Sequence, residues 1–169
     1  MIKNDWRSDI LCKIESDTPL VFGLDISSST IGWGLISITN PLNLVCYGIV
    51  KPLDAKHNEM ERLDGVFNYI FNLTKELSPS IISIEDVFLF MKGNSTARTI
   101  TILMAFNRIS ALASYQVNNN INFYSVHQIR KIIKNAYNID KVIEKEDIPD
   151  LIINNLSDKA DSLIIQNPF

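Results

Sequence analysis

The sequence has very few of the residues that hold soft metals or form disulfides. It contains two cysteines, Cys12 and Cys46, and two histidines, His57 and His127, all well separated along the chain. Structural zinc sites need four Cys or His ligands at short, characteristic spacings. That class of site is excluded here, so any metal bound by this protein must be held by oxygen ligands.

Long apolar runs are missing as well. No run approaches the roughly 18 residues of a membrane-spanning helix, and the first nine residues carry acids and lack the apolar core of an export signal. We therefore expect a soluble, cytoplasmic protein with no membrane partner. Repeats and flexible linkers are also absent, and 169 residues with 46% hydrophobic and 21% charged content suit one main domain stabilised by its own core.

The chain has no strong excess of either charge. Its net charge of −3 argues mildly against a nucleic-acid partner. The distribution is uneven, however, because residues 127–145 carry five bases against two acids, a local +3 that leaves −6 elsewhere. A basic stretch of this kind favours phosphate binding or is simply a solvated helix face, and charge alone does not decide between them.

Strand and helix patterns alternate along the chain. Apolar residues recur every four positions within residues 1–18, which predicts a helical extension ahead of the main domain, residues 19–169. Short polar turns separate the first three strand patterns, so these strands should be antiparallel neighbours. The expected strands are 20–27, 31–38, 43–50, 81–87 and 121–126, and the expected helices are 60–77, 95–117 and a pattern from 127 to the C-terminus with a break near Ile148-Pro149 and a restart at Ser157.

This order predicts an α/β protein. Three antiparallel strands followed by helices that alternate with parallel strands make a mixed five-stranded sheet with helices on both faces. Within the helix 60–77 the inward face is expected to carry Met60, Leu63, Phe67, Ile70, Thr74 and Leu77. Ribonuclease H-like architecture has this order of elements.

Acidic residues interrupt the apolar patterns at three places. Asp25 ends the run Val21-Phe22-Gly23-Leu24, and Glu85 ends the run Ile81-Ile82-Ser83-Ile84. A carboxylate inside a buried run costs several kcal/mol unless it is paired or binds metal. Asp158 and Asp161 follow in Ser157-Asp158-Lys159-Ala160-Asp161, where the i, i+3 spacing puts them on one helix face.

Each acid has an ordinary explanation. Asp25 could hydrogen-bond the Ser-rich turn that follows it, Glu85 could pair with a Lys or Arg, and Asp158 could stabilise a helix N-terminus. Together they are harder to explain, because four acids in one place would repel each other unless divalent cations neutralised them. Two Mg²⁺ or Mn²⁺ ions held by carboxylates are the equipment for in-line displacement at phosphorus.

At these residues the chain resembles the RuvC family of Holliday-junction resolvases, over about residues 20–166. The family's motifs look like Gly23-Leu24-Asp25 with Gly32-Trp33-Gly34, then Ile84-Glu85-Asp86-Val87-Phe88, then Asp158-Lys159-Ala160-Asp161-Ser162-Leu163. Carried over, the resemblance implies that Asp25, Glu85, Asp158 and Asp161 are the catalytic, metal-binding acids. The sequence departs from the family pattern at Ile26-Ser27, where the family usually has Pro-Gly.

The resemblance also implies contacts with DNA. Arg130 and Lys141 match basic residues that in the family contact backbone phosphate near the cut. The alternative is that both lie on a solvated helix face. Phe88 matches an aromatic that stacks on bases where the strands part, with a core position as the alternative. If the strand ends near Val87, Phe88 can reach the rim of the acidic site.

The implied function is a metal-dependent endonuclease that resolves four-way DNA junctions. Two opposed strands must be cut, so a symmetric homodimer is implied, with Mg²⁺ or Mn²⁺ and no small-molecule cofactor. Three rivals stay open: a nuclease of the same fold acting on another branched, single-stranded or RNA-containing substrate, an ATPase whose phosphate loop is 23–30, and a non-catalytic binding module. An ATPase of that kind needs two such domains, and 169 residues supply one. The non-catalytic binding module is disfavoured because all four acids are retained.

Overall fold

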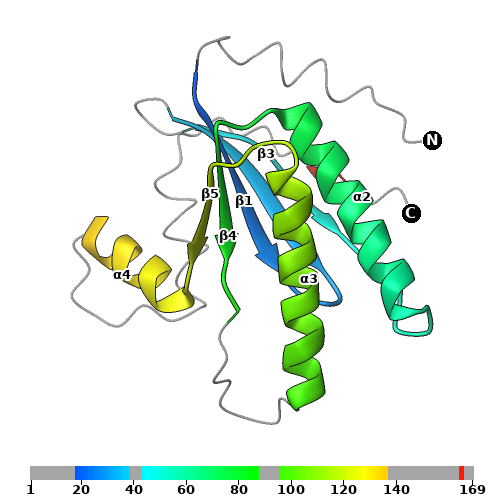
Figure 1. Cartoon of the computed structure of the whole chain (residues 1–169). Coiled ribbons are helices and arrows are strands. Elements are labelled where there is room, and N and C mark those ends of the chain that lie inside the picture. Colours follow the sequence, from blue (N-terminus) through cyan, green and yellow to red (C-terminus); the bar gives the residue numbers. More distant parts are fainter. Residues whose placement is uncertain (1–17, 39–42, 88–95, 137–163, 166–169) are drawn as a thin grey trace.

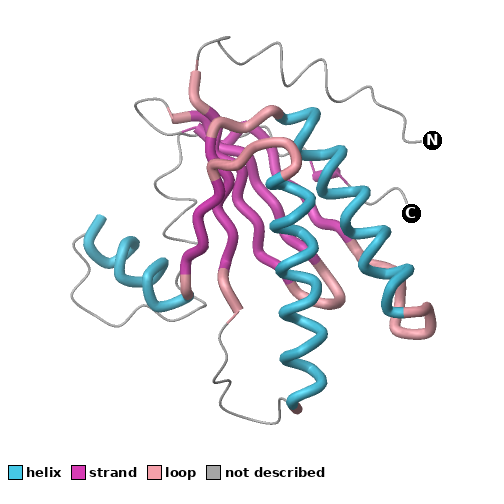
Figure 2. Tube along the Cα trace, in the orientation of Figure 1, coloured by secondary structure: helices cyan, strands magenta, loops and turns pink. Residues whose placement is uncertain are grey.

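The computed structural model describes residues 18–38, 43–87, 96–136 and 164–165, which build one mixed sheet with helices packed on it (Figures 1 and 2). In chain order the elements are β1 (Leu20–Ile26), β2 (Ile31–Ser37), β3 (Asn43–Val50), α2 (Glu59–Leu77), β4 (Ile81–Glu85), α3 (Ala97–Tyr115), β5 (Ile121–Tyr124), α4 (Val126–Ala136) and β6 (Ile164–Ile165). The strand order is β5-β4-β1-β2-β3-β6.

The strand directions agree with the sequence pattern. β1, β2 and β3 are antiparallel neighbours, and β4 and β5 run parallel to β1. The predicted mixed five-stranded sheet is therefore confirmed. The two-residue β6, parallel to β3 at the sheet edge, corrects one expectation: Ile164–Ile165 pair as a strand, where the sequence pattern predicted that the helix restarting at Ser157 would continue.

The two long helices begin and end at capping residues. At the start of α2, Asn58 Oδ1 accepts a hydrogen bond from the Met60 N–H at 2.8 Å, and Glu61 Oε2 accepts one from the Asn58 N–H at 3.3 Å. Its end is set by Ser78, whose φ of 44° is left-handed. Thr96 caps α3, where its Oγ1 accepts a hydrogen bond from the Thr99 N–H at 3.2 Å.

The hydrophobic core lies between α2, α3 and one face of the sheet (Figure 1). Phe22 of β1, Ile70 of α2 and Phe106 of α3 are completely buried there. The Phe22 and Trp33 rings pack with centroids 6.2 Å apart. Gly48 of β3 faces Trp33 of β2, and an added Cβ at Gly48 would lie 2.7 Å from the Trp33 ring, so a side chain there would force the ring to shift.

The prediction that Met60 lies on the inward face of α2 is wrong. Met60 is 69% exposed, whereas the buried positions nearest to it are Arg62 and Leu63. Met60 lies in the first turn, beside the Asn58 cap, and the helical repeat alone does not show where along its length a helix starts to bury a face. Leu63, Ile70, Thr74 and Leu77 are buried as expected and Phe67 is partly buried.

The opposite face of the sheet is the more open one. Its residues alternate with the core positions, and those of β1 are Val21, Gly23 and Asp25. α4 borders this face beyond β5, so helices flank both faces, as predicted (Figure 1). None of the helices that the structure describes has the length and apolarity needed to cross a membrane.

Candidate active site on the open face of the sheet

Asp25 and Glu85 lie at the carboxyl ends of two neighbouring parallel strands, Asp25 as the residue before the last of β1 and Glu85 as the last of β4. Leu24 of β1 is level with Ile84 of β4, so Asp25 and Glu85, the next residues, are level with each other. Leu24 and Ile84 are only 4% and 1% exposed and face the core. Because side chains alternate along a strand, the two acids lie together on the opposite face, on strands about 4.8 Å apart. The structure thus brings these two sequence-predicted site residues side by side.

A tyrosine and a glycine extend this row of residues. Tyr124 of β5 is level with Glu85, and Gly32 of β2 is level with Asp25. The row across four strands is therefore Tyr124, Glu85, Asp25 and Gly32. The sequence interpretation did not single out Tyr124, although it had a usable signal: the residue lies near the carboxyl end of a predicted parallel strand, where Asp25 and Glu85 also lie.

The row borders a hollow with a volume of about 690 Å³. Asp25, Glu85 and Tyr124 line it together with Ile129 and Ile133 of α4. Within the described part of the chain the walls are otherwise mainly apolar, so the two carboxylates are its charged feature. A wall of low polarity strengthens the electrostatic pull of acids on a bound cation.

Glycines form the floor of the hollow beside Asp25. Gly23, Gly32 and Gly34 all line it. An added Cβ at Gly32 would lie 3.9 Å from the Asp25 Cβ and 3.9 Å from the Asp25 carbonyl oxygen, which is ordinary contact without overlap. The space above Gly32 is thus large enough for a side chain and is left open next to the carboxylate.

Hydrogen bonds between Ser27 and Thr30 hold the turn between β1 and β2. Ser27 Oγ donates to the Thr30 carbonyl oxygen at 2.7 Å and accepts from the Thr30 N–H at 2.9 Å, and the Ser27 N–H donates to the Thr30 carbonyl oxygen at 3.0 Å. Ser27, which stands where the resembled family usually has Gly, therefore builds the turn. Among the described residues no hydrogen bond joins Asp25 to this turn, so that ordinary explanation of Asp25 is not observed.

Asp86 differs from its neighbour Glu85. Arg108 Nη2 of α3 lies 3.0 Å from Asp86 Oδ1, and the Arg108 guanidinium stacks 4.7 Å from the centre of the Phe123 ring. Asp86 is therefore held on the α3 side of the strand end, while Glu85 lines the hollow. The two consecutive acids have different surroundings and serve as test and control in mutagenesis.

The basic stretch begins on α4, which borders the hollow. Arg130 is partly buried, and its Nε is buried with no hydrogen-bond partner in the described part of the chain, whereas Lys131 and Lys134 are exposed. Ile129 and Ile133, its neighbours on the helix, line the hollow. Arg130 thus lies on the helix that borders the hollow, and the exposed lysines agree with a solvated face.

Four predicted site residues, Phe88, Lys141, Asp158 and Asp161, lie outside the described residues, as does the expected helix within residues 1–18. β4 ends at Glu85.

The oxygen donors at the site suit a hard cation. Asp25 and Glu85 offer carboxylate oxygens on one face, the ligands that Mg²⁺ and Mn²⁺ prefer. Among the residues that the structure describes, no group of three or more His, Cys, Asp or Glu side chains could hold a metal ion. Asp25 and Glu85 fit as part of such a site, since Mg²⁺ is often held by one or two carboxylates together with waters and substrate phosphate.

Sequence comparisons point to one family. The family model described as "Crossover junction endodeoxyribonuclease RuvC" matches residues 21–158. The RuvC of Thermosipho melanesiensis is 27% identical over 145 residues, covering 78% of this chain and 91% of that protein. The RuvC of Fusobacterium nucleatum is 28% identical over 158 residues, covering 82% of each.

Solved structures agree on the fold. A Thermus thermophilus RuvC structure matches with a TM-score of 0.64 at 16% identity, covering 89% of this chain and 84% of that one. The T. thermophilus RuvC in complex with a Holliday junction substrate matches with a TM-score of 0.56 at 12% identity, covering 81% and 90%. The ribonuclease H-like fold expected from the order of elements is confirmed.

Proposed function

Because the chain belongs to the RuvC family of crossover junction endodeoxyribonucleases, we propose that it resolves four-way DNA junctions by metal-dependent, paired and symmetric nicking. The observation that carries this proposal is the side-by-side placement of Asp25 and Glu85 on the open face. Two acids at equivalent positions of adjacent strands repel each other, and divalent cations relieve that repulsion.

In this proposal Asp25 and Glu85, with Asp158 and Asp161, hold a pair of Mg²⁺ or Mn²⁺ ions through their carboxylate oxygens. When bound, such cations activate a water for attack on phosphorus and stabilise the leaving 3′ oxygen. The bare surface at Gly32 leaves room beside Asp25 for the phosphate backbone. Without cations, the same acids keep a phosphate away from the site by charge repulsion.

DNA contacts beyond the acids come from the basic stretch and from Phe88. Arg130 lies on the helix that borders the hollow, where its guanidinium can pair with a backbone phosphate. Lys141 adds a second phosphate contact and Phe88 stacks on a base at the crossover. Cutting two opposed strands calls for two sites related by a two-fold axis, so the working unit is a homodimer.

The test is a cleavage assay with three substrates of matched length: a synthetic four-way junction, a linear duplex and a flap. Each is incubated with Mg²⁺, with Mn²⁺ and with a chelator. We expect nicks only in the junction, placed symmetrically in opposed strands, and only with a divalent cation. Equal cutting of the flap or of the linear duplex would favour a nuclease of the same fold with another substrate. Cutting in chelator would refute the proposed metal site.

A further inference from the structure

Two polar side chains reach the backbone near the ends of the acid-bearing strands from the core side of the sheet. Asn107 of α3 donates from Nδ2 to the Glu85 carbonyl oxygen at 2.8 Å. Arg62 of α2 donates from Nη2 to the carbonyl oxygen of Ser28, in the turn that follows Asp25, at 2.7 Å. Each contact joins a helix to the backbone close to one of the two acids.

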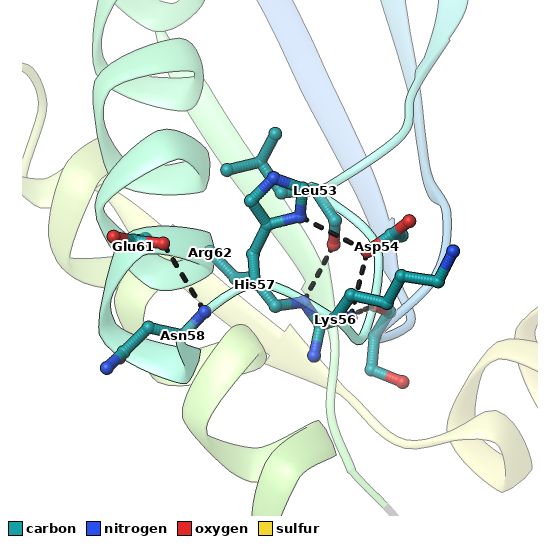
Figure 3. A network of polar contacts seen from close by, with 8 residues as sticks. Leu53, Asp54, Lys56, His57, Asn58, Glu61 and Arg62 are labelled. Atoms are coloured by element: carbon teal, nitrogen blue, oxygen red, sulfur yellow. Dashed lines mark hydrogen bonds and ion pairs between the residues drawn. The ribbon is translucent and has the colours of Figure 1, made fainter.

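The two contacts belong to one connected network. Arg62 also donates from Nε to the Leu53 carbonyl oxygen at 2.7 Å, in the segment before α2 that Figure 3 shows in close-up. Its guanidinium carbon lies 4.9 Å from the centre of the Phe106 ring. Phe106 directly precedes Asn107, so the chain of contacts runs from Ser28 through Arg62 and Phe106 to Glu85.

Core packing alone does not account for these residue types. Asn107 is 1% exposed and Arg62 is 9% exposed, although both side chains are polar. Asn107 Oδ1 is buried and has no hydrogen-bond partner among the described residues, and a buried, unsatisfied acceptor is unfavourable. A leucine would fill a similar volume without that cost. What asparagine adds at this position is its hydrogen bond to the strand end.

We propose that Asn107 and Arg62 are positioning residues that set the separation between Glu85 and Asp25. Asn107 fixes the backbone of Glu85 itself, and Arg62 fixes the turn three residues beyond Asp25. The inference rests on the proposed function, since the separation of the acids matters only if they share bound cations. Hydrogen-bonding partners behind metal ligands typically change metal affinity or activity by 10–100-fold when removed.

The primary experiment measures Mn²⁺ binding to the full chain without DNA, by electron paramagnetic resonance of free Mn²⁺. Asn107→Leu removes the donor and keeps the volume. Ser110→Ala is the matched control, because Ser110 is fully buried on the same helix but donates only within it, to the Phe106 carbonyl oxygen at 2.8 Å. We expect the dissociation constant for Mn²⁺ to rise about tenfold in Asn107→Leu and to stay at the wild-type value in Ser110→Ala.

A second readout separates positioning from general damage. Cleavage of the junction by Asn107→Leu should need about tenfold more Mn²⁺ for half-maximal rate and should recover at saturating Mn²⁺. Thermal unfolding checks that each variant is folded. If Asn107→Leu fails to fold, Arg62→Met, which keeps an unbranched side chain but loses both donors and the guanidinium over Phe106, carries the same expectation of weaker Mn²⁺ binding.

The outcomes distinguish this inference from the function on which it rests. Wild-type Mn²⁺ affinity in both folded variants would overturn the inference, and so would an equal loss in Ser110→Ala. Asp25→Asn is the reference for the proposed function, because it should lose Mn²⁺ binding whatever Asn107 does. If Asp25→Asn binds Mn²⁺ like the wild type, the proposed metal site is wrong, and the positioning role is overturned with it.

Discussion

Replacing Gly32 by valine should abolish most of the activity while leaving the fold intact. Gly32 is level with Asp25 on the neighbouring strand, and the space above it is part of the hollow. Valine there would put two methyl groups beside the carboxylate, where we propose that cations and the phosphate backbone bind. We expect a loss of at least about tenfold in cleavage rate, equivalent to about 1.4 kcal/mol in the barrier.

The structure gives the reason why stability should not change. A Cβ at Gly32 would make only ordinary contacts, at 3.9 Å, and Gly32 has no left-handed backbone angle. Valine is a good strand former, so the free energy of unfolding should change by less than about 1 kcal/mol. At Gly48 the opposite holds, because a Cβ would lie 2.7, 2.9 and 3.1 Å from three atoms of the Trp33 ring. Gly48→Ala should cost about 1–3 kcal/mol by overpacking.

Thermal unfolding and junction cleavage, measured on both variants, test this reasoning. Gly48→Ala should lower the melting temperature by about 3–10 °C, and Gly32→Val should leave it near the wild-type value. Wild-type cleavage by Gly32→Val would show that the space beside Asp25 is not used. A melting temperature of Gly32→Val as low as that of Gly48→Ala would show that the strand register is wrong.

Other expectations follow from single residues. Arg130→Ala and Lys141→Ala should each weaken DNA binding regardless of sequence and reduce the slope of log affinity against log salt by about one; unchanged slopes would assign both to a solvated face. Phe88→Ala should slow cleavage of a fully paired junction far more than of one with central mismatches, and equal losses would mean a core role. Burial raises the pKa of the Cys46 thiol to about 12, so in a Cys12→Ser background the folded protein should resist thiol alkylation at pH 8 and react once unfolded, because the thiolate is the reactive form; rapid labelling in the folded state would contradict the burial.

Local patterns in the sequence predicted the strands and the first two acids. Asp25 and Glu85 stand out because each ends an apolar run, and parallel strands bring their carboxyl ends to one edge. Those two facts can be read from the chain without any tertiary contact. The turn between β1 and β2 was also predicted, because Ser27 and Thr30 are typical turn residues, and side chains of this kind hydrogen-bond to nearby backbone.

The rest of the site depends on contacts that no local pattern encodes. Tyr124 joins the row only because β4 and β5 pair in one register. In the sequence, Asn107 and Arg62 look like ordinary helix residues. The hydrogen bond from Asn107 to Glu85 and the one from Arg62 to Ser28 arise from how α3 and α2 pack on the sheet. These interactions span 22 and 34 positions along the chain, beyond the reach of helix and strand periodicity.

The most direct test of the central claim compares Glu85→Gln with Asp86→Asn in Mg²⁺-dependent cleavage of a four-way junction. The two acids are consecutive, but Glu85 lines the hollow beside Asp25, whereas Asp86 pairs with Arg108 at 3.0 Å. We expect Glu85→Gln to bind the junction and fail to cut it, and Asp86→Asn to keep cutting. Cleavage by Glu85→Gln at the wild-type rate, or loss of cleavage in Asp86→Asn alone, would contradict a metal-binding role for the acids on the open face.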